Sequence, residues 1–518
     1  MAARVVVVGG GPVGMGLTIE LARRGIEVVT LEKHRDPQPV PKGQNLTART
    51  VEHFRSWGIA DELSAARTMT SSQKSEGMVV YGTALGDHRY SWLRRSAVGE
   101  FYAAANLRLP QYRTERVLRA RVAALPHATV RYGCTVVALE QDDESVRVGF
   151  TSVTGERESI VADYVVGADG SGSFVREAAG ITQERADHDR LMALVVLRSA
   201  ELDAVMQRLG DVAFVNVMDP ALEGYWQFFG RVDATRTWFF HAPVDPRSTL
   251  ATLDVPGILA KAVGRPIEAS VEYLGFWDLR FALADEYRRG RVFIAGDAAH
   301  SHPPYGGYGI NSGLEDAVDL GWKLAAQLEG WGGPRLLDSY DAERRPVFAS
   351  TRSQFIERSI LEDRDFLASF SPERDAAAFD AAWAARREAS ADEVDRFEPH
   401  YEGSPLIGGA GRPSAVGRHL HAARPGHHLA PGVAADGSEI FPALGTGFAL
   451  LRAPDADGED LVAAARAATV PLRVIPMDAA SAARYGARLV LVRPDQYVAW
   501  AADAADDPAR VISTAIGG

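Results

Sequence analysis

The chain has 518 residues, too many for one ordinary hydrophobic core, so we expect two or three domains. It is 46% hydrophobic and 24% charged, and its net charge of -12 argues against a nucleic-acid surface as the main function. No apolar stretch approaches the roughly 20 residues that cross a bilayer, and the N-terminus lacks the apolar core of a signal peptide. We therefore expect a cytoplasmic protein with no membrane or nucleic-acid partner.

A single cysteine, Cys134, excludes an internal disulfide, a CxxC redox pair and any cysteine-rich metal site. It falls in an apolar run that reads as a strand, where a buried structural thiol is expected. We predict no metal site, so redox chemistry in this chain requires a bound organic cofactor.

The first 32 residues have the order strand, glycine-rich turn, helix and second strand. Gly9, Gly11 and Gly14 form a GxGxxG pattern, in which the glycines permit a tight turn, pyrophosphate approach and close packing of helix on strand. The second strand ends at Glu32, where an acid can accept hydrogen bonds from the adenosine ribose. The pattern predicts dinucleotide binding without choosing between NAD and FAD.

Two more motifs of glycine and aspartate follow apolar strands far downstream. The first of them, Gly167–Arg176, contains Asp169. In the second, Gly296-Asp297 ends the apolar strand that precedes it, and glycine-rich residues 306–311 then precede a predicted helix. A carboxylate at Asp297 suits the hydroxyls of a ribityl chain. A helix N-terminus behind the glycine-rich loop stabilises negative charge on a reduced flavin. Each motif alone fits an Asp-capped turn, but the three in this order favour FAD.

These motifs resemble those of the group A flavoprotein monooxygenases, the family of p-hydroxybenzoate hydroxylase and phenol hydroxylase. The N-terminal GxGxxG, the DG motif at Gly167–Arg176 and the GD motif at Gly290–Lys323 occur in the family order. The segment Tyr340–Pro346 also matches, so the resemblance covers essentially the whole chain.

The resemblance implies an α/β fold with a Rossmann-type FAD-binding domain, a β-sheet substrate domain and a C-terminal thioredoxin-like α/β domain. Without a CxxC, the last domain is expected to serve packing or oligomer support rather than thiol chemistry. The implied first part of the FAD-binding domain is 1–180, with a substrate-domain insertion near 75–105. The substrate domain follows at 181–284. The second FAD-binding part and its helices are 285–402, and the thioredoxin-like domain is 403–518.

The resemblance also assigns residues to the cofactor. It places Glu32 on the ribose, Asp297 on the ribityl chain and Gln111 beside the flavin, and it links Asp169 to both FAD and NAD(P)H. The complete expected set is Gly9, Gly11, Pro12, Val13, Gly14, Glu32, Lys42, Gln111, Asp169, Asp297, Pro304, Gly307, Gly309, Ile310 and Asn311.

Three positions depart from the family pattern near the flavin ring. Lys42 stands where the family usually has arginine, and Tyr308 replaces the usual glutamine of the glycine-rich loop. Gln44 lies where some phenol-type relatives have a histidine, so a general base at that position is not supported. The catalytic residue is unassigned, with Pro303, Gln44 and Tyr308 as candidates.

The stretch between the second and third motifs, 190–283, reads as aromatic-rich strands. Similar proteins place a substrate-covering sheet here, although alternating aromatic side chains in a strand often serve sheet packing. The candidate substrate residues are Tyr225, Gln227, Phe229, Phe240 and His241.

The function implied by the resemblance is an FAD-dependent monooxygenase that consumes NADPH or NADH. It would hydroxylate a phenolic or polycyclic aromatic substrate with O2 through a flavin hydroperoxide. Baeyer–Villiger insertion or epoxidation on a similar substrate, and a flavin dehydrogenase or reductase without oxygen transfer, remain alternatives. The partner is expected to be a small aromatic molecule, and the protein a monomer or homodimer.

Overall fold

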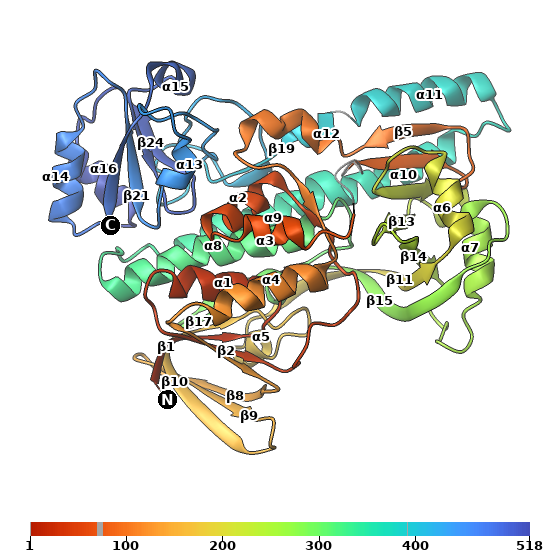
Figure 1. Ribbon diagram of the computed structural model, residues 1–518, viewed down its shortest axis with the longest axis horizontal. Helices are drawn as coiled ribbons and strands as arrows, with labels where there is room; N and C mark the ends of the chain where they lie inside the picture. The colour runs from red at the N-terminus through yellow and green to blue at the C-terminus, as the bar shows by residue number, and fades with distance from the viewer. Residues whose placement is uncertain (1, 70–75, 391) are drawn as a thin grey trace.

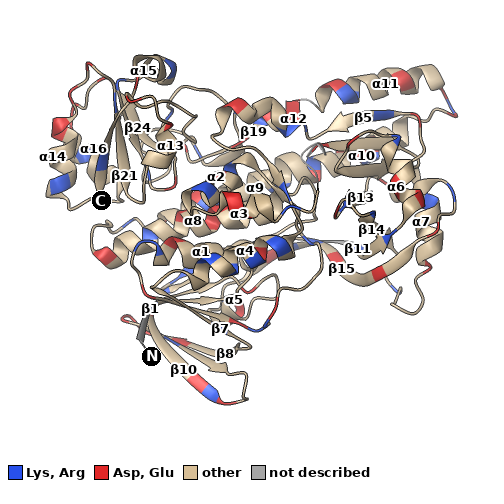
Figure 2. Cartoon of the chain, viewed as in Figure 1, with Lys and Arg blue, Asp and Glu red and all other residues tan. Residues whose placement is uncertain are grey.

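A computed structural model describes residues 2–69, 76–390 and 392–518 of the chain. Figure 1 shows three bodies: an N-terminal sheet with its helices, a second sheet beside it, and a C-terminal unit at the opposite end. Charged residues of both signs are interspersed along the helices and strands of all three bodies (Figure 2). None of the described helices combines the length and apolar character needed to cross a membrane.

The first sheet is built around five parallel strands. Val5 pairs with Val28 on one side and with Tyr164 on the other, and the strand order is β16-β17-β10-β1-β2-β7. A β8–β9 meander joins at β10. The strands are β1 (Ala2–Val8), β2 (Val28–Glu32), β7 (Ala128–Tyr132), β8 (Thr135–Gln141), β9 (Val146–Thr151), β10 (Arg157–Gly167), β16 (Arg288–Arg289) and β17 (Val292–Ile294).

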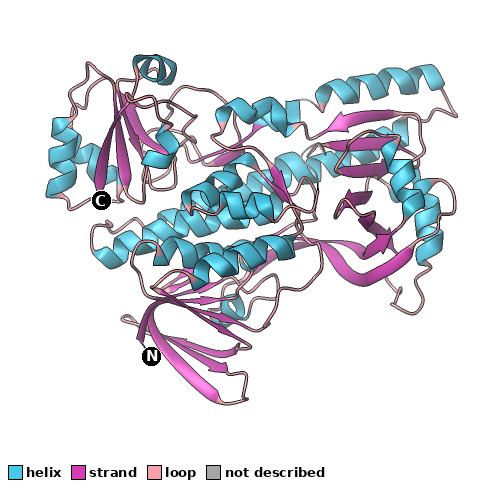
Figure 3. Cartoon of the chain, viewed as in Figure 1, coloured by secondary structure: helices cyan, strands magenta, loops and turns pink. Residues whose placement is uncertain are grey.

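Helices α1 and α8 cross at close range on one side of this sheet (Figure 3). A Cβ added at Gly16 would lie 3.0 Å from the Trp57 ring and 3.1 Å from Leu314, and one at Gly321 would lie 2.6 Å from the Glu20 side chain. Glycine is therefore required for this helix contact. The other elements of this body are α1 (Pro12–Ala22), β3 (Asn45–Leu46), α2 (Ala48–Ser56), α3 (Ala60–Ala65), η1 (Arg95–Phe101), β6 (Leu107–Arg108), α4 (Gln111–Ala123), α5 (Phe174–Ala178), η3 (Gly296–Ala298) and α8 (Tyr308–Glu329).

The second sheet has the order β18-β15-β11-β14-β13-β12-β4-β5, so two segments distant in the sequence share it. One face packs against α6 and α7, and the other face turns toward the first body. Its elements are β4 (Gly77–Tyr81), β5 (Arg89–Trp92), β11 (Gln183–Arg198), α6 (Ala200–Gln207), β12 (Phe214–Met218), η2 (Pro220–Leu222), β13 (Gln227–Arg231), β14 (Thr237–Val244), α7 (Val255–Val263), β15 (Ser270–Ala284) and β18 (His300–Ser301).

A run of helices then connects these bodies to a small C-terminal sheet of order β22-β21-β23-β24. β21 pairs parallel with β22 and antiparallel with β23. The connecting elements are α9 (Ser339–Thr351), η4 (Arg352–Glu357), α10 (Arg358–Ser369), α11 (Ala376–Ala389), α12 (Asp392–Arg396), β19 (Phe397–His400) and β20 (Ser414–Val416). The C-terminal elements are α13 (Ile440–Ala443), β21 (Phe448–Arg452), α14 (Glu459–Ala467), β22 (Leu472–Pro476), α15 (Ala479–Tyr485), β23 (Leu489–Val492), β24 (Val498–Ala502) and α16 (Pro508–Ala515).

Candidate active site

Two adjoining cavities follow the carboxyl ends of the parallel strands in the first sheet. One, of about 440 Å³, lies over β1 and β2, and the other, of about 400 Å³, lies between α8 and the second sheet. We call them the dinucleotide cavity and the ring cavity. The two cavities share five lining residues: Gly11, Lys42, Gln111, Ala168 and Gly170.

The glycines of the first motif shape the turn between the two cavities. Gly9 has φ +107°, and a Cβ there would lie 2.2 Å from the Ala168 carbonyl oxygen; one at Gly14 would lie 1.9 Å from the Gly9 carbonyl oxygen. Gly11 has no neighbour within 4 Å on its Cβ side, and it begins α1 without a side-chain cap. Free N–H groups of α1 therefore border open space suited to an anionic pyrophosphate.

Two acidic residues border the dinucleotide cavity. Glu32 accepts hydrogen bonds from the backbone N–H of Gly10 and of His34, each at 2.6 Å, so the carboxylate is fixed in place. Asp169 accepts from the Ser173 hydroxyl at 2.5 Å and from the Val175 N–H at 3.2 Å, and burial raises its pKa. Both carboxylates retain lone pairs for hydroxyl donors on a ligand.

Asp297 lies at the end of the strand β17 and lines the ring cavity. Its carboxylate accepts no hydrogen bond from any residue that the structure describes, and its exposed surface faces the cavity. Burial within the protein raises the pKa of Asp297, while His300 and then Lys42 lower it. A desolvated acceptor of this kind is stabilised by a ligand with several hydroxyl donors.

The N-terminus of α8 forms the opposite edge of the ring cavity. Gly307 adopts φ 69° and caps the helix without a side-chain bond, and Gly309 and Ile310 also line the cavity. Asn311 is turned away: its amide donates to the carbonyls of Asn45 and Gly307 and accepts from Thr47 and Thr50. Asn311 therefore fastens the helix end to the neighbouring strand, and the helix dipole faces the cavity.

Several buried polar atoms of the ring cavity have no hydrogen-bond partner in the described protein. They include both amide atoms of Gln44 and of Asn45, and Nε2 of His302. His302 Nδ1 bonds the Pro303 carbonyl at 2.5 Å, and burial lowers the pKa of His302 to about 4, so the free Nε2 is an acceptor. Buried polar groups are seldom left unpaired, so these atoms fit a polar ring system such as a flavin with its substrate.

Two of the residues predicted from the sequence to lie beside the flavin ring, Pro303 and Tyr308, do not line the ring cavity. Pro303 is buried and is not part of the cavity wall, where its neighbour Pro304 lies instead. Tyr308 points behind α8 into a separate small cavity of about 90 Å³, and its hydroxyl donates to Glu393 at 3.3 Å. Gln44 does line the ring cavity, and Gln111 holds the loop before it through the Gly43 N–H at 3.1 Å.

Aromatic side chains of the second sheet form the far wall of the ring cavity, but they are not the ones selected from the sequence. Tyr225, Gln227, Phe229, Phe240 and His241 do not line it. Phe229 and Phe240 stack on each other at 4.4 Å on the face covered by α6 and α7. Successive side chains of a strand alternate between faces, so Phe228 and Phe239 line the cavity in place of Phe229 and Phe240. His241 shares the face of Phe239 and stacks on Phe228 at 4.7 Å without lining the cavity. The wall consists of Trp92, Phe214, Asn216, Trp226, Phe228 and Phe239.

Sequence reasoning also missed three polar residues in this wall: Arg95, Arg108 and Asn216. Strand alternation in residues 214–239 could have identified Asn216 with its aromatic neighbours. Arg95 and Arg108 lie in a short helix and a two-residue strand, which carry no periodic signal.

A group of potential metal ligands lies away from these cavities, at β19. The ligand atoms of His400, Glu402 and His427 lie within 4.8 Å of one another. His427 is already held by two carboxylates, Glu398 at 2.8 Å on Nδ1 and Glu402 at 2.8 Å on Nε2. These contacts occupy both ring nitrogens of His427, and the absence of a metal site stays a prediction.

The protein families that match this chain are consistent with a cofactor site and a substrate site in these two cavities. A family model for an FAD binding domain matches residues 2–354, and one for the C-terminal part of aromatic-ring hydroxylases matches residues 423–517. The chain is 32% identical over 533 residues to a putative polyketide hydroxylase of Streptomyces halstedii. That alignment covers 96% of this chain and 92% of the relative.

Solved structures of similar proteins extend over the whole chain. The substrate-free rebeccamycin biosynthetic enzyme RebC has a TM-score of 0.83 at 28% identity, covering 100% of this chain and 99% of that one. A ternary complex of aklavinone-11 hydroxylase with FAD and aklavinone has a TM-score of 0.80 at 26% identity, covering 99% of both chains. The predicted fold class is thus confirmed, with a Rossmann-like FAD-binding domain, a substrate domain with a large mixed sheet and a small C-terminal α/β domain. The chain belongs to the FAD-binding aromatic-ring hydroxylases, the group A flavoprotein monooxygenases, and is a flavin-dependent monooxygenase that uses FAD, NAD(P)H and O2.

Proposed function

We propose that this monooxygenase hydroxylates a phenolic or polycyclic aromatic substrate bound between α8 and the second sheet. The observation that carries the proposal is the ring cavity itself. Its aromatic wall faces the glycine-rich end of α8 across one space, and that space shares five wall residues with the adjoining dinucleotide cavity. Aromatic side chains favour stacking with a flat apolar ring.

The cofactor contacts are also part of this proposal. We assign the pyrophosphate to Gly11 and the N-terminus of α1, the adenosine ribose to Glu32, the ribityl chain to Asp297, and the flavin ring to the space beside Gly307–Ile310. The open Cβ side of Gly11, the unpaired carboxylate of Asp297 and the uncapped start of α8 support these positions.

When bound, reduced FAD supplies the activation of O2 that ring hydroxylation needs. The chain's own residues position the two reactants and keep water away from them. The N–H groups and dipole at the start of α8 stabilise negative charge on the pyrimidine edge of the ring. Phe228 and Phe239 cover the substrate side, and His302 Nε2 offers a neutral acceptor at the cavity edge.

An isotope experiment tests this function. Purified protein with FAD is incubated with a panel of phenols and fused aromatic phenols, NADH or NADPH, and ¹⁸O-labelled O2. We expect at least one compound to stimulate NAD(P)H consumption and to gain one labelled oxygen, detected by mass spectrometry. Oxidised product that carries no label would contradict the proposal and would favour a dehydrogenase.

The relatives provide a narrower expectation. Because the similar proteins include a polyketide hydroxylase and an aklavinone hydroxylase, we propose that fused polyketide-type rings give stronger stimulation than single-ring phenols. The C-terminal unit is proposed to be a thioredoxin-like domain that acts in packing rather than thiol chemistry.

A further inference from the structure

Arg108 is a buried cation in the wall of the ring cavity. It belongs to β6, its exposed fraction is 6%, and its guanidinium lies 5.4 Å from the centre of the Phe214 ring. β6 pairs with β3 through Asn45, so the backbone of Arg108 lies on the FAD side while its side chain reaches the second sheet. The guanidinium therefore lies between the two walls of the cavity.

No carboxylate or carbonyl among the described residues pairs with the Arg108 guanidinium. Its Nε is buried without an acceptor, and the Phe214 ring lies against the guanidinium. The buried arginines of the C-terminal junction differ, because Arg344 and Arg493 each bond carboxylates directly. A buried charge without a partner is costly, so an unpaired arginine in a cavity wall indicates a missing anion.

A second cation increases this positive potential. Arg95 also lines the ring cavity, where it donates to the Gly306 carbonyl and lies over the Tyr308 ring at 5.7 Å. Burial, and secondarily the charge of Arg95, lower the pKa of Arg108 to about 9. The part of the cavity wall around Arg108 and Arg95 therefore carries more positive than negative charge.

The counter-charge within the cavity lies elsewhere. Asp297 faces it from η3, just after β17, with His300 and Lys42 acting on its carboxyl, and Glu393 lies behind the wall bonded to Trp92 at 3.1 Å. Neither carboxylate bonds Arg108.

Asn216 provides an independent observation in the same wall. It is 4% exposed, its Oδ1 is buried without a donor, and its side chain makes no hydrogen bond to the described protein. It lies two residues after Phe214 on β12, so both side chains share one face of the strand. The ring under Arg108 is thus followed by an unpaired amide that can bond a hydroxyl or carbonyl oxygen.

We propose that Arg108, supported by Arg95 and Asn216, forms an anion-binding subsite that selects aromatic substrates with a carboxylate or phenolate oxygen. This inference rests on the proposed hydroxylation and names its substrate class. The guanidinium pairs the anionic oxygen, Phe214 stacks under the guanidinium, and Asn216 bonds a neighbouring oxygen of the same substrate. Ring and anion together would satisfy all the unpaired groups of this wall.

A binding titration tests the subsite without turnover. The FAD-loaded protein is titrated with four matched probes, and dissociation constants are read from the change in flavin absorbance. The probes are 1-hydroxy-2-naphthoate, 1-methoxy-2-naphthoate, 1-hydroxy-2-naphthamide and 1-methoxy-2-naphthamide. We expect a probe with an anionic oxygen to bind about tenfold tighter or more than the methoxy amide. Tight binding of the methoxy acid identifies a carboxylate site, and tight binding of the hydroxy amide alone identifies a phenolate site.

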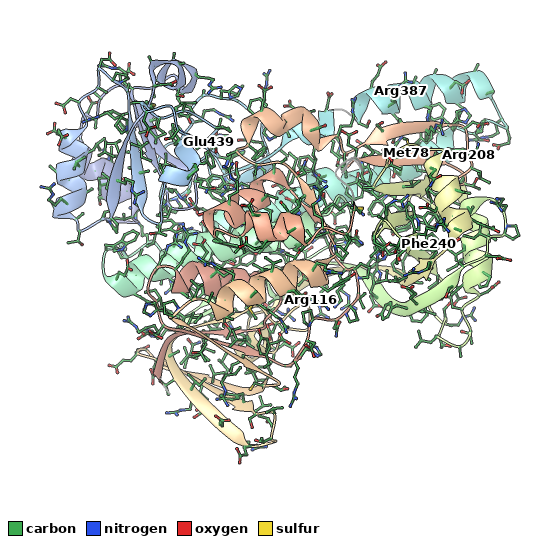
Figure 4. All side chains as sticks on the ribbon, in the orientation of Figure 1. Met78, Arg116, Arg208, Phe240, Arg387 and Glu439 are labelled. Carbon is green, nitrogen blue, oxygen red and sulfur yellow. The ribbon has the colours of Figure 1, made fainter. Side chains whose placement is uncertain are left out.

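Substitution of Arg108 completes the test. Arg108→Met should remove the preference for the anionic probe, and Arg108→Lys should keep part of it. The matched control is Arg116→Met, which removes an equal charge from the exposed face of α4 (Figure 4) and should leave all four constants unchanged.

Three results would overturn the inference: equal affinity for all four probes, an unchanged preference in Arg108→Met, or a Lys variant that folds but has no preference. Loss of FAD from Arg108→Met with the preference intact would assign the guanidinium to the cofactor instead. Failure of the proposed function is distinguishable, because it is detected as absence of labelled oxygen in the product and leaves these dissociation constants unaffected.

Discussion

At the scale of single residues, the site is distinguished by polar groups that the protein leaves unpaired. Asp297, Asn216, Gln44 and Arg108 all face the ring cavity without protein partners. A folded chain usually pairs its buried polar groups, so the unpaired atoms of Asn216, Gln44 and Arg108 at this cavity suit contacts with a ligand, and Asp297 adds an exposed carboxylate there. Asn311 is by contrast fully engaged, and Glu32 is held by two backbone N–H groups while keeping lone pairs for a ligand.

The first prediction concerns Asp297. Asp297→Ala should lower FAD affinity about tenfold or more, because a hydrogen bond to a charged acceptor contributes roughly 1.5 to 3 kcal/mol. The flavin content of the purified protein, read from its visible absorbance relative to protein absorbance, checks this. Asp245→Ala, which removes an exposed carboxylate of the substrate domain, is the control. Full flavin occupancy in Asp297→Ala would show that the ribityl contact is wrong.

The second prediction concerns Glu393, whose carboxyl is bonded by the indole of Trp92 and the hydroxyl of Tyr308. Burial raises its pKa to about 7, above the 4.5 of an unperturbed glutamate. The folded protein therefore binds this proton more tightly than the unfolded chain, and stability from this group is present below pH 4.5 and lost as the pH rises through 7.

Glu393→Gln should remove this contribution to the pH dependence. The difference in free energy of unfolding between the wild type and the variant, measured by denaturant titration from pH 4.5 to 8, should shift in favour of the variant as the pH rises. A difference that does not change with pH would show that Glu393 ionises normally.

At the scale of elements, the alternation of side chains along β13 and β14 separates substrate contacts from core packing. Phe239 lines the ring cavity, whereas Phe240 packs with Phe229 beneath α6 and α7. Figure 4 labels Phe240 within the second sheet. Two adjacent phenylalanines in one strand therefore serve different purposes.

This pair gives the third prediction. Phe239→Ala should raise the KM for the aromatic substrate, because it removes part of the cavity wall. Phe240→Ala should leave that KM unchanged but lower the free energy of unfolding by about 3 to 5 kcal/mol, the usual cost of emptying a phenylalanine site in a core. Steady-state kinetics and denaturant unfolding of both variants distinguish these roles. An equal KM effect from both substitutions would contradict the assignment of faces.

The sequence allowed the strands, the glycine turns and the acids of the FAD site to be predicted, because each follows from a local pattern. Gly9, Gly11 and Asp297 are recognisable from the strands that precede them. The face of each aromatic residue in β13 and β14 was not predictable, because both faces of these strands are buried and each strand carries two phenylalanines in succession. Arg108 became a candidate only when folding brought β6 beside the second sheet.

At the scale of the whole molecule, a buried ionic network joins the C-terminal unit to the helices of the FAD-binding body. Arg493 bonds Glu343 on α9 at 2.7 Å and Asp319 on α8 at 3.0 Å. Lys323 bonds Asp319 at 2.8 Å and Glu343 at 2.6 Å, and the Trp322 indole donates to Asp495 at 3.0 Å. The ionic side chains have no exposed surface, so α8 is fixed at its C-terminal half while its N-terminus faces the ring cavity.

The fourth prediction follows from this junction. Arg493→Met should lower the free energy of unfolding by about 3 to 5 kcal/mol, because it leaves Asp495 without a buried counter-charge and leaves Lys323 alone to balance Glu343 and Asp319. Denaturant titration checks the loss, and flavin content shows whether the N-terminus of α8 is disturbed as well. Arg510→Met, which removes an exposed arginine from α16, is the matched control. Equal stability of the two variants would mean that the network adds nothing.

The wide separation of the FAD contacts has a consequence for how the protein is made. Gly9 lines the dinucleotide cavity and Asp297 lines the adjoining ring cavity, yet a ribosome that adds roughly 5 to 20 residues per second needs about 15 to 60 s to pass from one to the other. During that interval the nascent chain can form the turn at Gly9 but has neither the ribityl acceptor nor the start of α8. Loading of FAD is therefore a late event in biosynthesis. A cell short of flavin would accumulate chains whose N-terminal sheet is folded while the ring cavity is empty.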